Sequence, residues 1–238
     1  MSSVIIVFVC HDKTTVFNVL KKVPGAMIIF VGDQPVDEDT RALPNLIVAR
    51  ELPDNIEAEK KLLTFTAWYA IIKNNLFMDY EYICILENDV LLSINYVTDL
   101  QKTISTSEND LITFCMGRSA CFYADIKINI LEDCLNIKGL DVEGVKSHIH
   151  EKGWYPSTNQ CIKRTLLNDF VDWYYPFCLY IKTRHEEKFS WYHERLFSVY
   201  LHSINKEVKF MHGLHHLSNK SHEKTFNKKE KAMKMILF

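Results

Sequence analysis

The chain has 238 residues, a length that suits one large domain or one domain with a small appendage. Hydrophobic residues make up 47% of it and aromatic residues 12%, which excludes a disordered chain and allows a substantial core. Its 28 Lys and Arg residues against 30 Asp and Glu residues give a net charge of −2, which excludes a general electrostatic attraction to nucleic acid.

Short apolar runs alternate with helical patterns along the first half of the chain. Strands are expected at Val4–Cys10, Ala26–Val31, Leu46–Ala49, Tyr82–Leu86 and Asp110–Met116. Helices are expected over Thr15–Lys22 with Thr14 or Thr15 as N-cap, over Glu57–Asn75, and from Ser93 or Asn95 to Ile104. This alternation predicts an α/β fold, a Rossmann-type, mostly parallel sheet with right-handed crossovers and flanking helices.

The second half of the chain lacks this regular alternation. The segment from 131 to 150 is mixed and helical in parts, and the aromatic and polar segment Trp154–Gln160 predicts a loop. Helices are expected over Thr165–Trp173 and Trp191–Ile204, and a short strand over Val208–Met211.

The seven cysteines form no Cys-x-x-Cys pair, and several lie inside apolar runs. Cysteine in such runs acts as a small hydrophobic residue, so we expect a reducing compartment. The apolar run Val4–Cys10 lacks a basic flank and is too short for a signal sequence. No stretch of the sequence reaches the ~20 apolar residues that a transmembrane helix needs. These features predict a soluble, cytoplasmic protein without a transmembrane segment.

Two carboxylates, Glu87 and Asp89, follow the apolar run Tyr82–Leu86, with Asn88 between them. A buried unpaired carboxylate is costly, whereas open α/β folds place their ligand sites at this end of the strands. Carboxylate oxygens suit a hard cation such as Mg²⁺ or Mn²⁺, which in turn can hold a diphosphate. The alternative is a turn whose carboxylates are solvated or cap the next helix. The apolar run Val90–Leu92 that follows favours a site.

Polar side chains also follow the first two predicted strands. His11 comes directly after Val4–Cys10, and Asp33 follows the second strand, so a nucleotide could lie against both. The chain has no Gly-x-Gly-x-x-Gly motif and no Walker A loop, which argues against a dehydrogenase and a P-loop NTPase.

Four histidines lie within eleven residues near the C-terminus: His212, His215, His216 and His222. Mn²⁺ accepts imidazole beside carboxylates, so one of them could complete a metal site begun by Asp89. Lys220, in the same segment, could contact phosphate oxygens. The alternative is a solvated polar loop.

Glu194 stands at the start of the predicted helix Trp191–Ile204. A glutamate there could act as a general base or bind sugar hydroxyls. The alternative is a helix start stabilised by the helix dipole.

Taken together, these stretches resemble the GT-A-fold glycosyltransferases, which use nucleotide sugars. The acidic run resembles their DxD motif. Trp154–Gln160, His193–Arg195 with the helix through Tyr200, and His216–His222 occur in the order and spacing of small members from bacterial polysaccharide clusters and large DNA viruses. The resemblance covers most of residues 4–222.

The resemblance implies one GT-A-like domain over residues 1–222 and a basic C-terminal tail over residues 223–238. Within the domain, residues 1–116 would bind the nucleotide, and residues 117–222 would bind the acceptor and complete the metal site. The implied activity moves a sugar from a nucleoside-diphosphate sugar, with a UDP-sugar favoured, to a hydroxyl of a glycan or other acceptor. The implied cofactor is Mn²⁺ or Mg²⁺.

The resemblance also implies roles for single residues. Asp89 would be the main metal ligand, Glu87 would contact the ribose or the metal through water, and His216 or His222 would complete the metal shell. Thr158 and Asn159 would lie near the sugar or acceptor, on whose ring Trp154 and Tyr155 could stack. Glu194 would be the base of an inverting reaction, or would orient substrate in a retaining one. One departure is that the first acid is Glu rather than Asp, and its longer arm changes its reach.

Two other functions remain open at this point. A nucleotidyltransferase also builds metal sites at acidic strand ends, although this chain lacks the Gly-rich basic loop expected near the first strand. A sugar- or nucleotide-binding module without catalysis would use the acidic pair only to close a turn. We expect no nucleic-acid partner. The Lys-rich tail is either a solvated helix or a weak contact with an anionic membrane surface.

Overall fold

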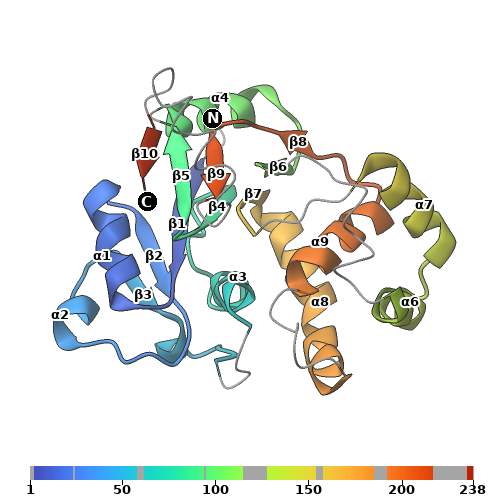
Figure 1. Ribbon diagram of the computed structural model, residues 1–238, viewed down its shortest axis with the longest axis horizontal. Coiled ribbons are helices and arrows are strands. Elements are labelled where there is room, and N and C mark those ends of the chain that lie inside the picture. The colour runs from blue at the N-terminus through green and yellow to red at the C-terminus, as the bar shows by residue number, and fades with distance from the viewer. Residues whose placement is uncertain are drawn as a thin grey trace.

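The computed structural model describes residues 3–23, 25–57, 62–93, 95–114, 128–153, 158–184, 192–216 and 235–237. A seven-stranded sheet with the order β3-β2-β1-β4-β7-β6-β8 runs through the middle of the molecule (Figure 1). Its strands are β1 (Val4–Cys10), β2 (Met27–Phe30), β3 (Leu46–Val48), β4 (Tyr82–Glu87), β6 (Leu111–Thr113), β7 (Gln160–Lys163) and β8 (Lys209–Phe210). Every neighbouring pair is parallel except the two pairs that β7 makes. The predicted α/β class and mostly parallel sheet are therefore confirmed.

Strand β7 is the element that the sequence interpretation missed. The predicted loop Trp154–Gln160 was wrong at its end, because Gln160 begins a strand that lies antiparallel between β4 and β6. Cys161 and Ile162 in this strand are fully buried and belong to different hydrophobic clusters. With only two such residues between polar neighbours, the strand has too short an apolar pattern to stand out.

A second, three-stranded antiparallel sheet has the order β10-β5-β9. Its central strand β5 (Val90–Ser93) begins directly after Asp89, and β9 (Leu214–His216) and β10 (Met235–Leu237) pair with it on either side. The register sets His216 opposite Val90, so the backbone of the histidine segment reaches the acidic motif. Part of the predicted basic tail is thus paired in a sheet.

The helices occupy most of the predicted positions. They are α1 (Lys13–Lys22), α2 (Glu38–Arg41), the 3-10 turn η1 (Ala49–Glu51), α3 (Thr64–Lys73), α4 (Tyr96–Thr106), α6 (Ile128–Ile137), α7 (Val142–Lys152), α8 (Arg164–Arg184) and α9 (Tyr192–Ser203). In the part of the chain that the structure describes, none of these helices has the length and apolar character that crossing a bilayer demands.

Three helix boundaries differ from the expectation for local reasons. The N-cap of α1 is Asp12 rather than Thr14 or Thr15, since its carboxylate accepts a hydrogen bond from the Thr15 N–H at 2.8 Å. Helix α3 begins only at Thr64, because Leu63 has a left-handed backbone with φ of 45°. Helix α8 continues through Pro176 to Arg184, beyond the expected end at Trp173.

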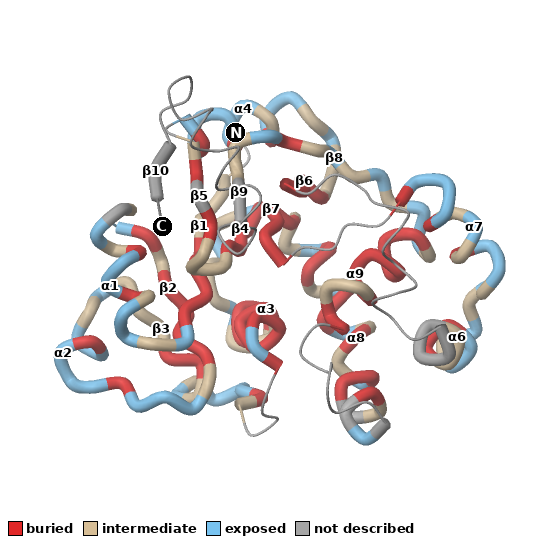
Figure 2. Tube along the Cα trace, viewed as in Figure 1, coloured by how far each residue is buried: buried red, intermediate tan, exposed pale blue. Residues whose placement is uncertain are grey.

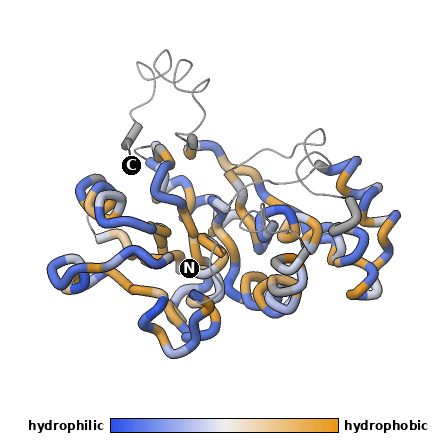
Figure 3. Tube along the Cα trace, turned by 60° about the horizontal axis from the view of Figure 1, so that its bottom comes forward, coloured by the Kyte–Doolittle hydropathy of each residue, from blue (hydrophilic) through white to orange (hydrophobic). Residues whose placement is uncertain are grey.

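The hydrophobic core forms two clusters on opposite faces of the main sheet. Buried residues follow the central strands and extend onto α3, α8 and α9 (Figure 2). Strand β4 contributes to both, with Ile83 and Ile85 in the cluster of α3, α8 and α9, and Cys84 and Leu86 in that of α1 and α4. Figure 3 shows hydrophobic stretches concentrated along the central strands and hydrophilic ones on the outer turns. The described cysteines carry buried free thiols, and Cys115 and Cys121 lie outside the described residues.

Candidate functional site

A pocket of about 240 Å³ lies where β1, β2 and β4 end. The described residues that line it are Val9, His11, Val31, Leu63, Thr64, Glu87, Asn88 and Asp89. The parallel register explains the convergence, because Val9 lies opposite Glu87 and Cys10 lies opposite Phe30, the residue before Val31. The pocket therefore lies at the carboxyl edge of neighbouring parallel strands, where open α/β folds bind ligands.

The acidic motif lines this pocket as a turn between two strands. Glu87 ends β4, Asn88 and Asp89 form the turn, and Val90 starts β5. The Glu87 backbone N–H donates to Asn159 Oδ1 at 2.6 Å, and the Thr64 hydroxyl donates to Glu87 Oε1 at 3.1 Å. The Oδ1 atom of Asp89 is buried. Both strands thus hold the two carboxylates at the pocket instead of releasing them to bulk solvent.

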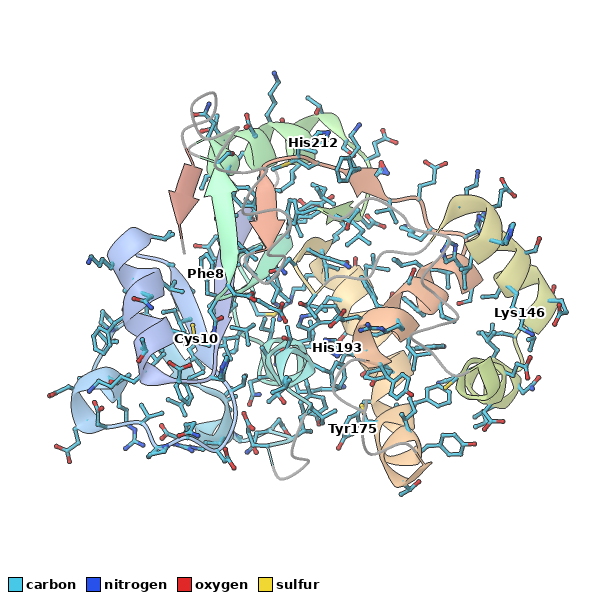
Figure 4. All side chains as sticks on the ribbon, viewed as in Figure 1. Phe8, Cys10, Lys146, Tyr175, His193 and His212 are labelled. Atoms are coloured by element: carbon cyan, nitrogen blue, oxygen red, sulfur yellow. The ribbon has the colours of Figure 1, made fainter. Side chains whose placement is uncertain are left out.

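His11 enters the pocket from the end of β1. Its Nδ1 lies 3.4 Å from Asn88 Nδ2, and its Nε2 lies 3.5 Å from a carboxylate oxygen of Asp12. The preceding residue, Cys10, points into the core (Figure 4), and burial raises the pKa of its thiol to about 12. A neutral thiol is a poor nucleophile and metal ligand, so His11 rather than Cys10 is the candidate for chemistry at this strand end, and its role stays a prediction.

Four of the predicted site residues, His11, Glu87, Asn88 and Asp89, therefore come together at one pocket. Asp33, Thr158 and Glu194 are not among the described residues that line it. Trp154, Tyr155, Lys220 and His222 lie outside the described residues, as does the side chain of His216.

Glu57 is a carboxylate near this site that the sequence interpretation did not single out. Its Oε1 accepts a hydrogen bond from the Gly32 N–H at 2.9 Å, on the loop that carries Asp33. Partial burial raises the pKa of Glu57, against the opposing effect of that hydrogen bond. No sequence signal marks this residue, because it lies in a loop 25 positions away from its partner.

Glu194 lies in the first turn of α9 and forms an ion pair with Arg195, whose Nη1 is 3.1 Å from Glu194 Oε2. The neighbouring His193 ring packs against the rings of Trp68 and Phe65 on α3, at centroid distances of 5.6 and 6.1 Å (Figure 4). Helix α9 thus packs through its first turn against α3, the helix whose start lines the pocket. The role of Glu194 as a base stays a prediction.

Thr158 and Asn159 are both buried in front of β7. Asn159 uses its Oδ1 to accept the hydrogen bond from the Glu87 backbone N–H. This contact ties the start of β7 to the end of β4. It gives Asn159 a demonstrable contact with the acidic motif, while its predicted contact with the sugar or acceptor stays a prediction.

The donor set at the pocket is chemically suited to a hard divalent cation. Glu87 and Asp89 supply carboxylates and Asn88 an amide oxygen, which are the ligand types that Mg²⁺ and Mn²⁺ prefer. Among the described residues no group of three or more His, Cys, Asp and Glu side chains is placed to hold a metal. One or two carboxylates nevertheless suffice where water and substrate phosphates complete the shell. The residues therefore fit such a cation.

No protein-family model matches the sequence, and no curated protein matches it. Among solved structures, the apo structure of the bifunctional glycosyltransferase WbbM superposes with a TM-score of 0.62 at 12% sequence identity. The match covers 92% of this chain and 46% of that chain, so this chain spans less than half of its length. The chain has a glycosyltransferase fold.

Two further glycosyltransferases are similar at lower TM-scores. The mannosyltransferase Ktr4p from S. cerevisiae has a TM-score of 0.44 at 14% identity, with 90% of this chain and 70% of that chain covered. Core-mannan synthase A from Aspergillus fumigatus, in its Mn/GDP form, has a TM-score of 0.49 at 10% identity, with 91% and 75% covered. The WbbM superposition thus confirms the predicted GT-A-like glycosyltransferase fold. A sequence identity of 12% shows the fold alone.

Proposed function

We propose that this protein is a metal-dependent glycosyltransferase that moves a sugar from a nucleoside-diphosphate sugar to a hydroxyl of a glycan or other acceptor. The observation that carries the proposal is the pocket at the ends of β1, β2 and β4, with His11, Glu87, Asn88 and Asp89 gathered in a glycosyltransferase fold. A UDP-sugar is the favoured donor, on the resemblance to small GT-A enzymes.

Asp89 and Glu87 would hold the cation, Mn²⁺ or Mg²⁺, at the pocket. When bound, the cation would supply positive charge next to the leaving diphosphate. His216 or His222 is proposed to complete the shell, which the pairing of the β9 backbone with β5 next to Asp89 supports.

The remaining walls of the pocket suit the nucleoside. Val9 and Val31 offer apolar surface for a base or ribose, while His11 and Asn88 offer polar groups at its edge. Asp33, on the loop after β2, is proposed to contact the ribose or base, and Lys220 to contact phosphate oxygens as a point charge.

Acceptor chemistry is assigned to the second half of the chain. If the reaction inverts the anomeric centre, Glu194 takes the proton of the attacking hydroxyl. If the reaction retains it, Glu194 orients substrate. Thr158, Asn159, Trp154 and Tyr155 are proposed to contact the transferred sugar or the acceptor.

Calorimetric titration of UDP and GDP, with and without Mn²⁺, tests the proposal. We expect Mn²⁺-dependent binding of one nucleotide, weakened about 100-fold in Asp89→Ala, because loss of a charged ligand costs on the order of 3 kcal/mol. Asp39→Ala, an exposed carboxylate on α2, is the matched control and should bind like the wild type. Absence of nucleotide binding under every condition would contradict the proposal.

A further inference from the structure

The first residue of α3 makes a direct contact with the acidic motif. Thr64 Oγ1 donates a 3.1 Å hydrogen bond to Glu87 Oε1, although the two residues lie 23 positions apart. Both line the pocket, and Thr64 is only 4% exposed. A hydrogen bond to a carboxylate is stronger where bulk water is excluded, so this contact restricts where the oxygen can lie.

The backbone before Thr64 is unusual. Leu63 adopts φ 45° and ψ −118°, a conformation that is costly for a residue with a Cβ, and it provides no side-chain cap for α3. This sharp entry brings the start of the helix to the pocket, with the Thr64 hydroxyl bonded to Glu87. Strain of this kind persists where the surrounding structure requires it, which is common at ligand sites.

A second contact holds the main chain of Glu87. Asn159, 1% exposed, accepts the Glu87 backbone N–H at 2.6 Å. Asn159 therefore fixes the main chain of Glu87, while Thr64 fixes its side chain. Glutamate has one more rotatable bond than aspartate, so fixing its carboxylate when a ligand binds costs more side-chain entropy. The hydrogen bond from Thr64 restrains the carboxylate to one position and so avoids that cost.

We propose that Thr64 is a positioning residue that holds the Glu87 carboxylate in place for the nucleoside diphosphate and its cation. The inference rests on the proposed function, because it assigns Thr64 to the same donor pocket. It predicts that the hydroxyl of residue 64, rather than its shape, determines nucleotide affinity.

The test compares three substitutions by calorimetric titration of UDP and GDP with Mn²⁺. Thr64→Val keeps the shape and removes the hydroxyl, and we expect it to weaken binding about tenfold. Thr64→Ser keeps the hydroxyl and removes the methyl group, and should bind within about twofold of the wild type. Thr66→Val, at another buried threonine of α3, should also bind like the wild type while changing thermal stability as much as Thr64→Val does.

Each outcome decides the inference. Wild-type affinity in Thr64→Val, or a loss in Thr64→Ser equal to that in Thr64→Val, would overturn it and leave the proposed function standing. If the wild-type protein binds neither nucleotide, the proposed function fails and the inference fails with it. Should Thr64→Val not fold, Thr64→Ala removes the same hydroxyl from a helix start and should show the same tenfold loss.

Discussion

At the residue scale, the acidic motif shows the effect of a glutamate, which is longer than an aspartate, at its first position. The motif resembles a DxD sequence but has Glu87 in its first position. The additional methylene lets the carboxylate reach the hydroxyl at the start of α3, while the main chain of Glu87 stays bonded to Asn159. Glu87 thus has a hydrogen-bond partner, Thr64, that the shorter side chain of an aspartate at this position would reach less readily.

The strained backbone of Leu63 gives a prediction about stability. Glycine adopts its conformation without a Cβ clash, and relief of such strain is worth about 1–3 kcal/mol. The side chain is 46% exposed, so its removal loses little burial, and the added freedom of glycine in the unfolded chain costs about 1 kcal/mol. We expect urea unfolding of Leu63→Gly to show an unchanged free energy of unfolding, or one raised by about 1 kcal/mol.

The neighbouring residue provides the comparison for this measurement. Leu62 is 2% exposed, so Leu62→Gly should lower the free energy of unfolding by about 3 kcal/mol or more. A clear loss of stability in Leu63→Gly, similar to that in Leu62→Gly, would show that the left-handed backbone carries no strain.

At the scale of elements, helices α7 and α9 meet through two histidines. The His148 and His202 rings pack edge to face at 4.9 Å, and His202 Nε2 lies 2.7 Å from the Gly153 carbonyl oxygen. A carbonyl can only accept, so Nε2 carries the proton of this bond. Burial lowers the pKa of His202 to about 4, an effect that outweighs the hydrogen bond to Gly153. Both helices are therefore packed around a neutral imidazole.

This packing predicts a loss of stability in mild acid. In the unfolded chain His202 binds a proton near pH 6.5, whereas in the folded chain it does so only near pH 4. Its contribution is thus fully present above pH 6.5 and is lost as the pH falls through 4, by up to about 3 kcal/mol. His202→Gln keeps a donor for Gly153, and its free energy of unfolding should fall less between pH 6.5 and 4.

The control for this prediction is the exposed His212. Its ring packs on that of Phe210 at the molecular surface, so His212→Gln makes the same substitution outside the contact between α7 and α9. If His202→Gln shows the same dependence as the wild type, other groups must cause the acid effect.

The sequence predicted elements well where their patterns are long and uniform. Strands β1 and β4 contain long apolar runs, and the four site residues lie at or directly after the ends of these parallel strands, so their convergence could be expected. Strand β7 could not be expected, because its burial depends on insertion between two strands from distant parts of the chain. Thr64 could not be expected either, since nothing in an apolar helical segment indicates which threonine contacts Glu87.

At the scale of the whole molecule, the two halves of the chain share one sheet. Strands β7 and β8 come from the second half, and β7 lies between β4 and β6 of the first half. Strand β4 sends Ile83 and Ile85 to one hydrophobic cluster and Cys84 and Leu86 to the other. Loss of either cluster therefore exposes the same central strand, which couples the two faces of the sheet.

This coupling predicts that the molecule unfolds in a single transition. Leu100 on α4 is fully buried in one cluster and Phe170 on α8 is fully buried in the other. Leu100→Ala and Phe170→Ala should each lower the free energy of unfolding by about 2–5 kcal/mol. Circular dichroism and tryptophan fluorescence should still report one coincident transition in urea for both variants. Ile137→Ala, at a side chain exposed on α6, should leave the midpoint almost unchanged. If Phe170→Ala separates an early transition from a later one that Leu100→Ala alone shifts, the two faces of the sheet unfold independently.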